Sequence, residues 1–160
     1  MALTRFAPIL VAAVSLVFGT ASGAAADDVA VIVNRGNPIT SLSMIQLRKI
    51  VLAQEAKWPS GGRIIVWMAP PGHPERSRTL KVVCGMTETD YTLHFMHASF
   101  NGDGGDPPKT AASSALVRQS IATAANGVGF IWAALVDDSV KLLAIDGSVP
   151  GQPGYKLTPK

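Results

Sequence analysis

The side chains best suited to chemistry lie in one short segment that leads into a predicted helix. The segment spans residues 72–77, and five of its six residues are candidates: Gly72, His73, Glu75, Arg76 and Ser77. The unpaired N–H groups at a helix N-terminus carry about half a positive charge and favour an anion. Gly72 permits close approach of the backbone, Arg76 offers a fork of N–H donors, and Ser77 offers a hydroxyl. A protonated His73 also donates, so the segment predicts a site for a small oxyanion.

Two residues of the same segment oppose an anion. Pro74 lacks an N–H donor, and Glu75 places a negative charge where the anion would bind. A glutamate in the first turn also complements the helix dipole without any ligand. Glu75 therefore has two interpretations, a capping residue or an obstacle in the site.

Three further residues are candidate ligand contacts. Ser113 and Ser114 stand at the start of a predicted helix over 114–125, where either also suits an ordinary N-cap. Asn34 ends a predicted strand over 29–33, and open α/β sheets bind ligands beyond the carboxyl ends of their strands. An asparagine at that place is also a common turn residue. We expect these three side chains to join the site.

Other chemistry has weaker support. His94 and His97 share a helix face, but two ligands do not make a metal site. Residues 101–106 resemble a calcium loop, yet Ala112 stands where a bidentate glutamate is required. The sequence has no nucleophile elbow, P-loop, HExxH or CxxC motif. We therefore predict no metal, no cofactor and no enzymatic activity.

Composition indicates one compact domain. The chain has 160 residues, of which 48% are hydrophobic and 16% charged. Its net charge of +3 is spread along the chain without a basic run, so nucleic acid is not a predicted partner. The lone cysteine, Cys84, excludes an intramolecular disulfide and suits a buried apolar position.

The N-terminus has the pattern of a secretory signal peptide. Arg5 precedes an apolar run over 6–18, and small residues follow as far as Ala26. Pro8 and the small residues argue against the alternative, an uncleaved anchor. We predict a cleaved signal peptide over 1–26 and a periplasmic protein. An α/β domain is expected over 27–147, followed by a loosely held tail over 148–160, which is rich in Gly and Pro.

Strands and helices alternate in the predicted domain, which favours a sheet flanked by helices. We expect strands over 29–33, 63–68, 128–132 and 141–145, and helices over 44–51, 75–84, from Thr87 onward and over 114–125. Ser43 and Gln46 form a capping box. Tyr91, Phe95 and Met96 are the expected apolar stripe of the third helix. The first strand is apolar throughout, as in parallel sheets buried on both faces.

The order of several short motifs resembles a known family. They are Asn-x-x-Asn-Pro over 34–38, Ser-Leu-Ser over 41–43, Lys-Trp-Pro-x-Gly over 57–61, a Pro-Gly loop leading into Glu75-Arg76, Gly-Val-Gly-Phe-Ile over 127–131, and Asp-Gly over 146–147. Together they resemble the phosphate-binding, periplasmic substrate-binding proteins of ABC uptake systems, over most of 29–147. The resemblance implies a type 2 periplasmic binding-protein fold, with a mostly parallel sheet flanked by helices. The chain matches one lobe plus part of the crossover.

The resemblance also implies a site and partners. In the family, a Ser-Gly-Thr-Arg run binds phosphate; the corresponding positions here read His73-Pro74-Glu75-Arg76, so that Arg76 alone keeps the family identity. A serine-containing turn at 112–114 supplies donors from the other side. The implied partners are phosphate or a similar oxyanion and a membrane ABC permease or sensor protein. A homodimer is a further expectation.

Three functions follow as hypotheses. The first is an exported solute-binding protein that binds an oxyanion without chemistry. The second is an interaction or sensory accessory domain on the same fold, in which the anion site is lost. The third is a periplasmic hydrolase with His73 and Glu75 as acid and base, for which no nucleophile is evident.

Overall fold

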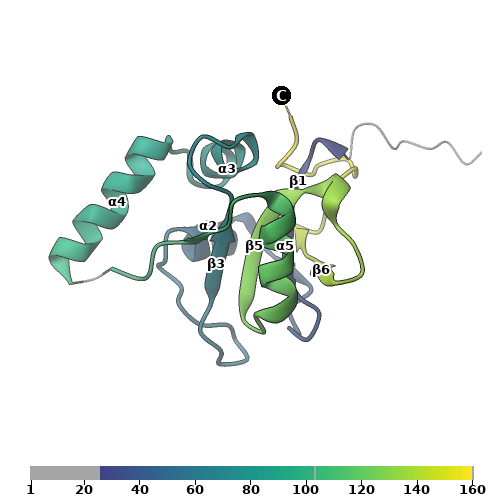
Figure 1. Ribbon diagram of the computed structural model, residues 1–160, viewed down its shortest axis with the longest axis horizontal. Helices are drawn as coiled ribbons and strands as arrows, with labels where there is room; N and C mark the ends of the chain where they lie inside the picture. Colours follow the sequence, from purple (N-terminus) through teal and green to yellow (C-terminus); the bar gives the residue numbers. More distant parts are fainter. Residues whose placement is uncertain (1–25, 103, 160) are drawn as a thin grey trace, which may run out of the picture.

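The computed structural model describes residues 26–102 and 104–159, so the predicted signal peptide lies outside them except for Ala26. The strands are β1 (Val29–Asn34), β2 (Ser41–Leu42), β3 (Ile65–Met68), β4 (Lys109–Thr110), β5 (Gly127–Trp132), β6 (Val140–Leu142) and β7 (Ala144–Ile145). The helices are α2 (Met44–Val51), α3 (Pro74–Thr79), the π-helical turn η1 (Leu80–Cys84), α4 (Glu88–Asn101), α5 (Ser114–Thr123) and the 3₁₀ turn η2 (Ala133–Leu135). Figure 1 shows their arrangement.

The main sheet has the strand order β4-β3-β5-β1-β6. β3 pairs in parallel with β4 and β5, whereas β1 is antiparallel to both β5 and β6. Four of these five strands therefore run in one direction, which confirms the predicted α/β fold with a mostly parallel sheet. The prediction that β1 belongs to the parallel set is wrong. An apolar run indicates that a strand is buried on both faces of the sheet. It does not indicate direction, because a central strand is buried whether it is parallel or antiparallel to its neighbours.

Helices cover both faces of this sheet, with α5 in front and α2 behind in Figure 1. α5 buries Val117 and Ile121 against Ala30 and Ile32. Close packing on β5 depends on Gly129, where an added Cβ would lie 2.8 Å from Ile121 Cγ1. The other face packs against α2 and η1, in a core that contains alternate residues of β1 and β5. The molecule therefore has three layers, α/β/α.

Helix boundaries follow the expected local signals. Ser43 and Gln46 form a capping box at α2, and Thr87 and Asp90 form a second one at α4. The helix predicted over 75–84 is α3 continued by the π-helical turn η1. It ends at Gly85, whose φ of +68° favours glycine. These signals act within one turn of chain, so they can be read without tertiary structure.

Several elements differ from the predictions, and the short strands β2 and β4 were not expected. The strand expected over 141–145 is interrupted at Leu143: β6 pairs with β1, and β7 pairs with β2 in a separate sheet. In α4, Tyr91 is buried and Phe95 partly buried, but Met96 is half exposed. Helical spacing places Met96 near the apolar stripe, but α4 lies at the side of the molecule and has neighbours on one side only (Figure 1).

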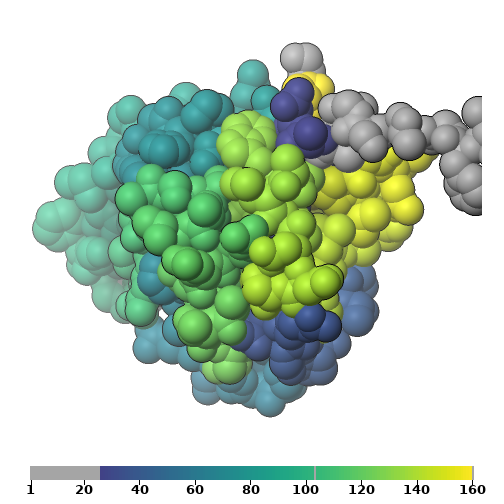
Figure 2. All heavy atoms as spheres, turned by 45° about the vertical axis from the view of Figure 1, so that its right-hand side comes forward, coloured from purple at the N-terminus to yellow at the C-terminus, as the bar shows by residue number. Residues whose placement is uncertain are grey.

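The C-terminal tail packs against the domain, so the expectation of a loosely held tail is wrong. Leu157 and Tyr155 are buried. The N–H of Val29 donates to the carbonyl of Leu157 at 2.9 Å, and the Tyr155 hydroxyl donates to the carbonyl of Val29 at 2.5 Å. The tail, yellow in Figure 2, lies against the body of the molecule. Glycine and proline shape its turns, while two apolar side chains hold it in place.

Cys84 is buried, as predicted. Burial raises the pKa of its thiol to about 11, because the uncharged form is favoured away from water. Within residues 26–102 and 104–159, no helix is long and apolar enough to cross a membrane.

Candidate functional site

Two of the predicted segments meet at one edge of the sheet. The loop before α3 follows the carboxyl end of β3, and Ser113 and Ser114 follow the carboxyl end of β4. Because β3 and β4 are parallel neighbours, both ends lie at the same edge. We call this region, residues 72–77 together with Ser113 and Ser114, the cradle.

A carboxylate of the chain itself lies in the cradle. Ser114 Oγ donates to Glu75 Oε1 at 2.7 Å, and the two residues are only 4% and 3% exposed. His73 Nδ1 lies 3.6 Å from the same Glu75 oxygen, at ion-pair distance when the imidazole is protonated. Two predicted anion contacts, His73 and Ser114, therefore face Glu75. Glu75 is therefore buried and hydrogen-bonded, and it is not a simple surface cap.

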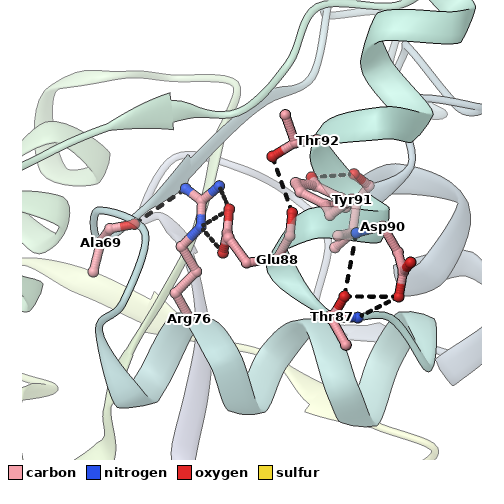
Figure 3. A network of polar contacts seen from close by, with 8 residues as sticks. Ala69, Arg76, Thr87, Glu88, Asp90, Tyr91 and Thr92 are labelled. Carbon is pink, nitrogen blue, oxygen red and sulfur yellow. Dashed lines mark hydrogen bonds and ion pairs between the residues drawn. The ribbon is translucent and has the colours of Figure 1, made fainter.

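Arg76 forms an ion pair with a second carboxylate, that of Glu88 (Figure 3). Its Nε lies 2.9 Å from Glu88 Oε2, and Nη2 lies 2.6 Å from Oε1. Nη1 donates to the carbonyl of Ala69 at 3.2 Å, and the guanidinium carbon lies 5.9 Å from the centre of the Tyr91 ring. Arg76 is 6% exposed. The fork that the sequence predicts for an external anion thus binds Glu88 from α4.

The other cradle residues contribute less than predicted. Gly72 is exposed, with a φ of +91° that suits a turn. Ser77 is exposed and lines a separate hollow beside Lys81. Ser113 is the N-cap of α5, where its Oγ accepts from the N–H of Leu116 at 3.3 Å. Its ordinary capping role is therefore present.

Asn34 lies at the opposite edge of the sheet. β1 runs against β5, so the carboxyl end of β1 faces the start of β5. Asn34 Nδ2 donates to the carbonyls of Ile121 and Ala122, both at 2.9 Å, and Oδ1 accepts from the N–H of Gly36. Asn34 thus caps the end of α5 and does not join the cradle. Its predicted position assumed that β1 runs parallel to its neighbours.

Glu88 and Tyr91 were missed by the sequence predictions. Glu88 reads as an acidic residue in the first turn of α4, and Tyr91 reads as a core residue. The only local signal is that α4 begins shortly after α3, which allows its first turn to reach Arg76. Pairing Arg76 with Glu88 required knowledge of how the two helices are placed.

The structure offers no support for a metal centre in the described ranges, 26–102 and 104–159, where no group of three His, Cys, Asp or Glu residues is placed to bind an ion. His94 Nε2 lies 3.1 Å from the carbonyl of Leu52 instead, and His97 is exposed.

The fold is that of the phosphate substrate-binding proteins. The chain is similar to a structure described as a phosphate ABC transporter substrate-binding protein with bound phosphate from Clostridium perfringens (TM-score 0.64, 20% identity, 79% of this chain and 49% of that chain). It is also similar to an ABC-type phosphate transport receptor from Vibrio cholerae (TM-score 0.63, 22% identity, 79% of this chain and 50% of that chain). A third similar structure is PstS from Borrelia burgdorferi (TM-score 0.61, 12% identity, 78% of this chain and 49% of that chain).

The chain spans about half the length of each of these proteins. No known family profile and no curated protein matches it. The resemblance read from the sequence motifs is confirmed for the fold.

Proposed function

We propose that the chain is a non-enzymatic, exported interaction domain on the fold of the phosphate substrate-binding proteins, with its cradle filled by its own carboxylate. The observation that carries this proposal is the buried hydrogen bond between Ser114 Oγ and Glu75 Oε1. The periplasm is the proposed compartment, supported by the signal-peptide pattern over 1–26.

The charges in the cradle and at its neighbour Glu88 oppose an external anion. Glu75 and Glu88 are acidic and Arg76 is basic, so the three side chains sum to one negative charge when all are ionised. A phosphate entering here would have to displace Glu75 from Ser114 or Glu88 from Arg76. Either step leaves a buried charged group without its partner, which is costly. The bound carboxylates therefore occupy the positions that a ligand would need.

The outer face of α4 is the proposed interaction surface. Leu93, Met96 and Phe100 are 43%, 49% and 84% exposed, and their spacing places them along one side of the helix. Residues 91–101 contain no Asp, Glu, Lys or Arg. We propose a second copy of the chain as the partner. An antiparallel pair would set Leu93 of one copy against Phe100 of the other, without opposing like charges.

Sedimentation across a concentration series tests this surface. The wild-type chain is expected to form a dimer, and Phe100→Asp is expected to shift it to monomer. Ile45→Asp is the matched control, because Ile45 is 71% exposed on α2. A wild-type chain that stays monomeric throughout would contradict the dimer.

Calorimetry tests the closed cradle, with the chain purified after export and dialysed exhaustively. We expect no heat with phosphate or sulfate for the wild type. Glu75→Ser removes the internal carboxylate and is expected to gain measurable phosphate binding. Asp138→Ser removes an exposed carboxylate elsewhere and is expected to gain none. A folded Glu75→Ser variant without phosphate binding would show that Glu75 does not stand in for an anion.

Oxyanion binding in an ABC uptake system is the second candidate function. It is favoured by the meeting of the α3 loop and the α5 N-terminus at one sheet edge, and by the bound phosphate described for the Clostridium perfringens protein. Phosphate binding by the wild type at micromolar affinity, about −8 kcal/mol, would favour this candidate over the closed cradle.

A further inference from the structure

A second hollow, distinct from the cradle, lies between the α3–η1 segment and the C-terminal tail. Its volume is about 770 Å³. Ser77, Arg78 and Lys81 line one wall, and Lys156 and Thr158 line the other. We call it the tail hollow. Ser77 is the one cradle residue that lines it.

The tail hollow is cationic. Arg78, Lys81 and Lys156 contribute three positive charges from two segments that are distant in sequence. Lys156 Nζ pairs with Asp146 Oδ2 at 2.7 Å, which is the one ion pair that these three cations make within the described ranges 26–102 and 104–159. Among the residues that line the hollow there are thus three cations and no carboxylate, and one of the cations is paired.

Arg78 is already held in place. Its Nη1 donates to the carbonyl of Asp27 at 2.5 Å, and its guanidinium carbon lies 5.1 Å from the centre of the Trp132 ring. A guanidinium has five N–H donors, so most remain for a ligand. A side chain that is fixed before binding loses less entropy when the ligand arrives.

The tail hollow also has apolar surface. Val82 and Tyr155 line it, and the Tyr155 ring is fixed by its hydrogen bond to Val29. Ser77 and Thr158 add hydroxyl donors. A single phosphate or sulfate ion is much smaller than the hollow, and the cations stand on two walls. A ligand with several negative groups would match this arrangement better than one ion would.

We propose that the tail hollow binds a small polyanion carrying two or three carboxylate or phosphoryl groups, with Arg78, Lys81 and Lys156 as its charged contacts. This site goes beyond the proposed interaction function and does not depend on the state of the cradle. The C-terminal tail would then contribute ligand contacts as well as packing against the domain.

Calorimetry with citrate, pyrophosphate and inorganic phosphate tests the proposal at low ionic strength. Citrate or pyrophosphate is expected to bind at least tenfold more tightly than phosphate, and the stronger of the two identifies the preferred chemistry. Lys81→Glu is expected to weaken that binding at least tenfold. Lys57→Glu, the same change at an exposed lysine before β3, is expected to change it less than twofold.

Two further measurements keep the outcome clear. Arg78→Gln is expected to weaken the same probe, with circular dichroism confirming the fold. Asp138→Ser, an exposed position outside both the cradle and the tail hollow, is expected to leave its affinity unchanged. The proposal is overturned if neither probe binds more tightly than phosphate, or if folded Lys81→Glu binds as well as the wild type.

Discussion

Arg76 and Glu88 join α3 to the first turn of α4 by two short contacts, 2.9 Å and 2.6 Å long. Close by, the Tyr91 hydroxyl donates to the carbonyl of Val51 at 2.6 Å. These contacts fasten the N-terminal half of α4 to the body of the domain. The C-terminal half, which carries exposed Phe100, lies further out (Figure 1). The same ion pair thus occupies Arg76 and positions the proposed interaction helix.

Glu88→Ala is expected to destabilise the fold by about 3 kcal/mol, because it leaves the buried Arg76 guanidinium without its carboxylate. The Glu88 side chain is 28% exposed, which places the effect at the lower end of the range for buried pairs. Urea denaturation measures the free energy of unfolding. Asp138→Ala is the control, with a change below about 0.5 kcal/mol. A Glu88→Ala variant as stable as this control would show that the pair contributes little.

Ser114→Ala is expected to cost about 1–2 kcal/mol, because Glu75 loses a hydrogen-bond donor while its carboxylate stays buried. Ser113→Ala, its neighbour, removes only an N-cap and is expected to cost about 1 kcal/mol. A folded Ser114→Ala variant as stable as the wild type would contradict the assigned role of Ser114.

Local patterns predicted most of the fold. The capping boxes at Ser43 and Thr87 and the glycine at 85 act within one turn, so the sequence alone identifies them. The direction of β1 and the packing of the tail depend on partners more than 90 residues away. Nothing in the local pattern of Val29–Asn34 distinguishes a parallel from an antiparallel central strand.

The candidate site was predicted less completely. The family resemblance implied that the loop before α3 and Ser114 contact one ligand, and the structure places both at the carboxyl ends of the parallel neighbours β3 and β4. The sequence misplaced Asn34, because the argument from strand ends fails for a reversed strand. The sequence did not decide whether Glu75 is a helix-capping residue or an obstacle in the anion site. The choice depends on the position of Ser114, which only the structure gives.

Removing residues 148–160 is expected to destabilise the domain by several kcal/mol, since two buried side chains are lost together with the tail's hydrogen bonds to Val29 and Asp28 and its ion pair with Asp146. Tyr155→Phe isolates one part: it deletes the hydroxyl that donates to Val29 and is expected to cost about 1 kcal/mol. Thermal unfolding measures both. Removing residues 159–160 alone is the control and is expected to have little effect. A full deletion that unfolds at the wild-type temperature would restore the expectation of a loose tail.

The Cys84 thiol is expected to resist alkylation in the native protein. Burial hides it, and the pKa of about 11 keeps it almost entirely in the unreactive thiol form at pH 8. Labelling with a thiol reagent is expected to proceed at the rate at which the domain opens. In urea it should accelerate to the rate of an unfolded cysteine. Rapid labelling in buffer, before any loss of circular dichroism, would contradict the buried position.

Acid is expected to weaken the capping box of α4. Hydrogen bonds from Thr87 hold the pKa of Asp90 below its ordinary value. A carboxyl with a lowered pKa in the folded state stabilises the protein above its unfolded pKa, about 3.9, and loses this contribution as the pH falls through the folded pKa. Unfolding free energies from pH 6 to pH 2 should therefore fall more steeply for the wild type than for Thr87→Val. Parallel curves for the two proteins would show that Thr87 does not shift Asp90.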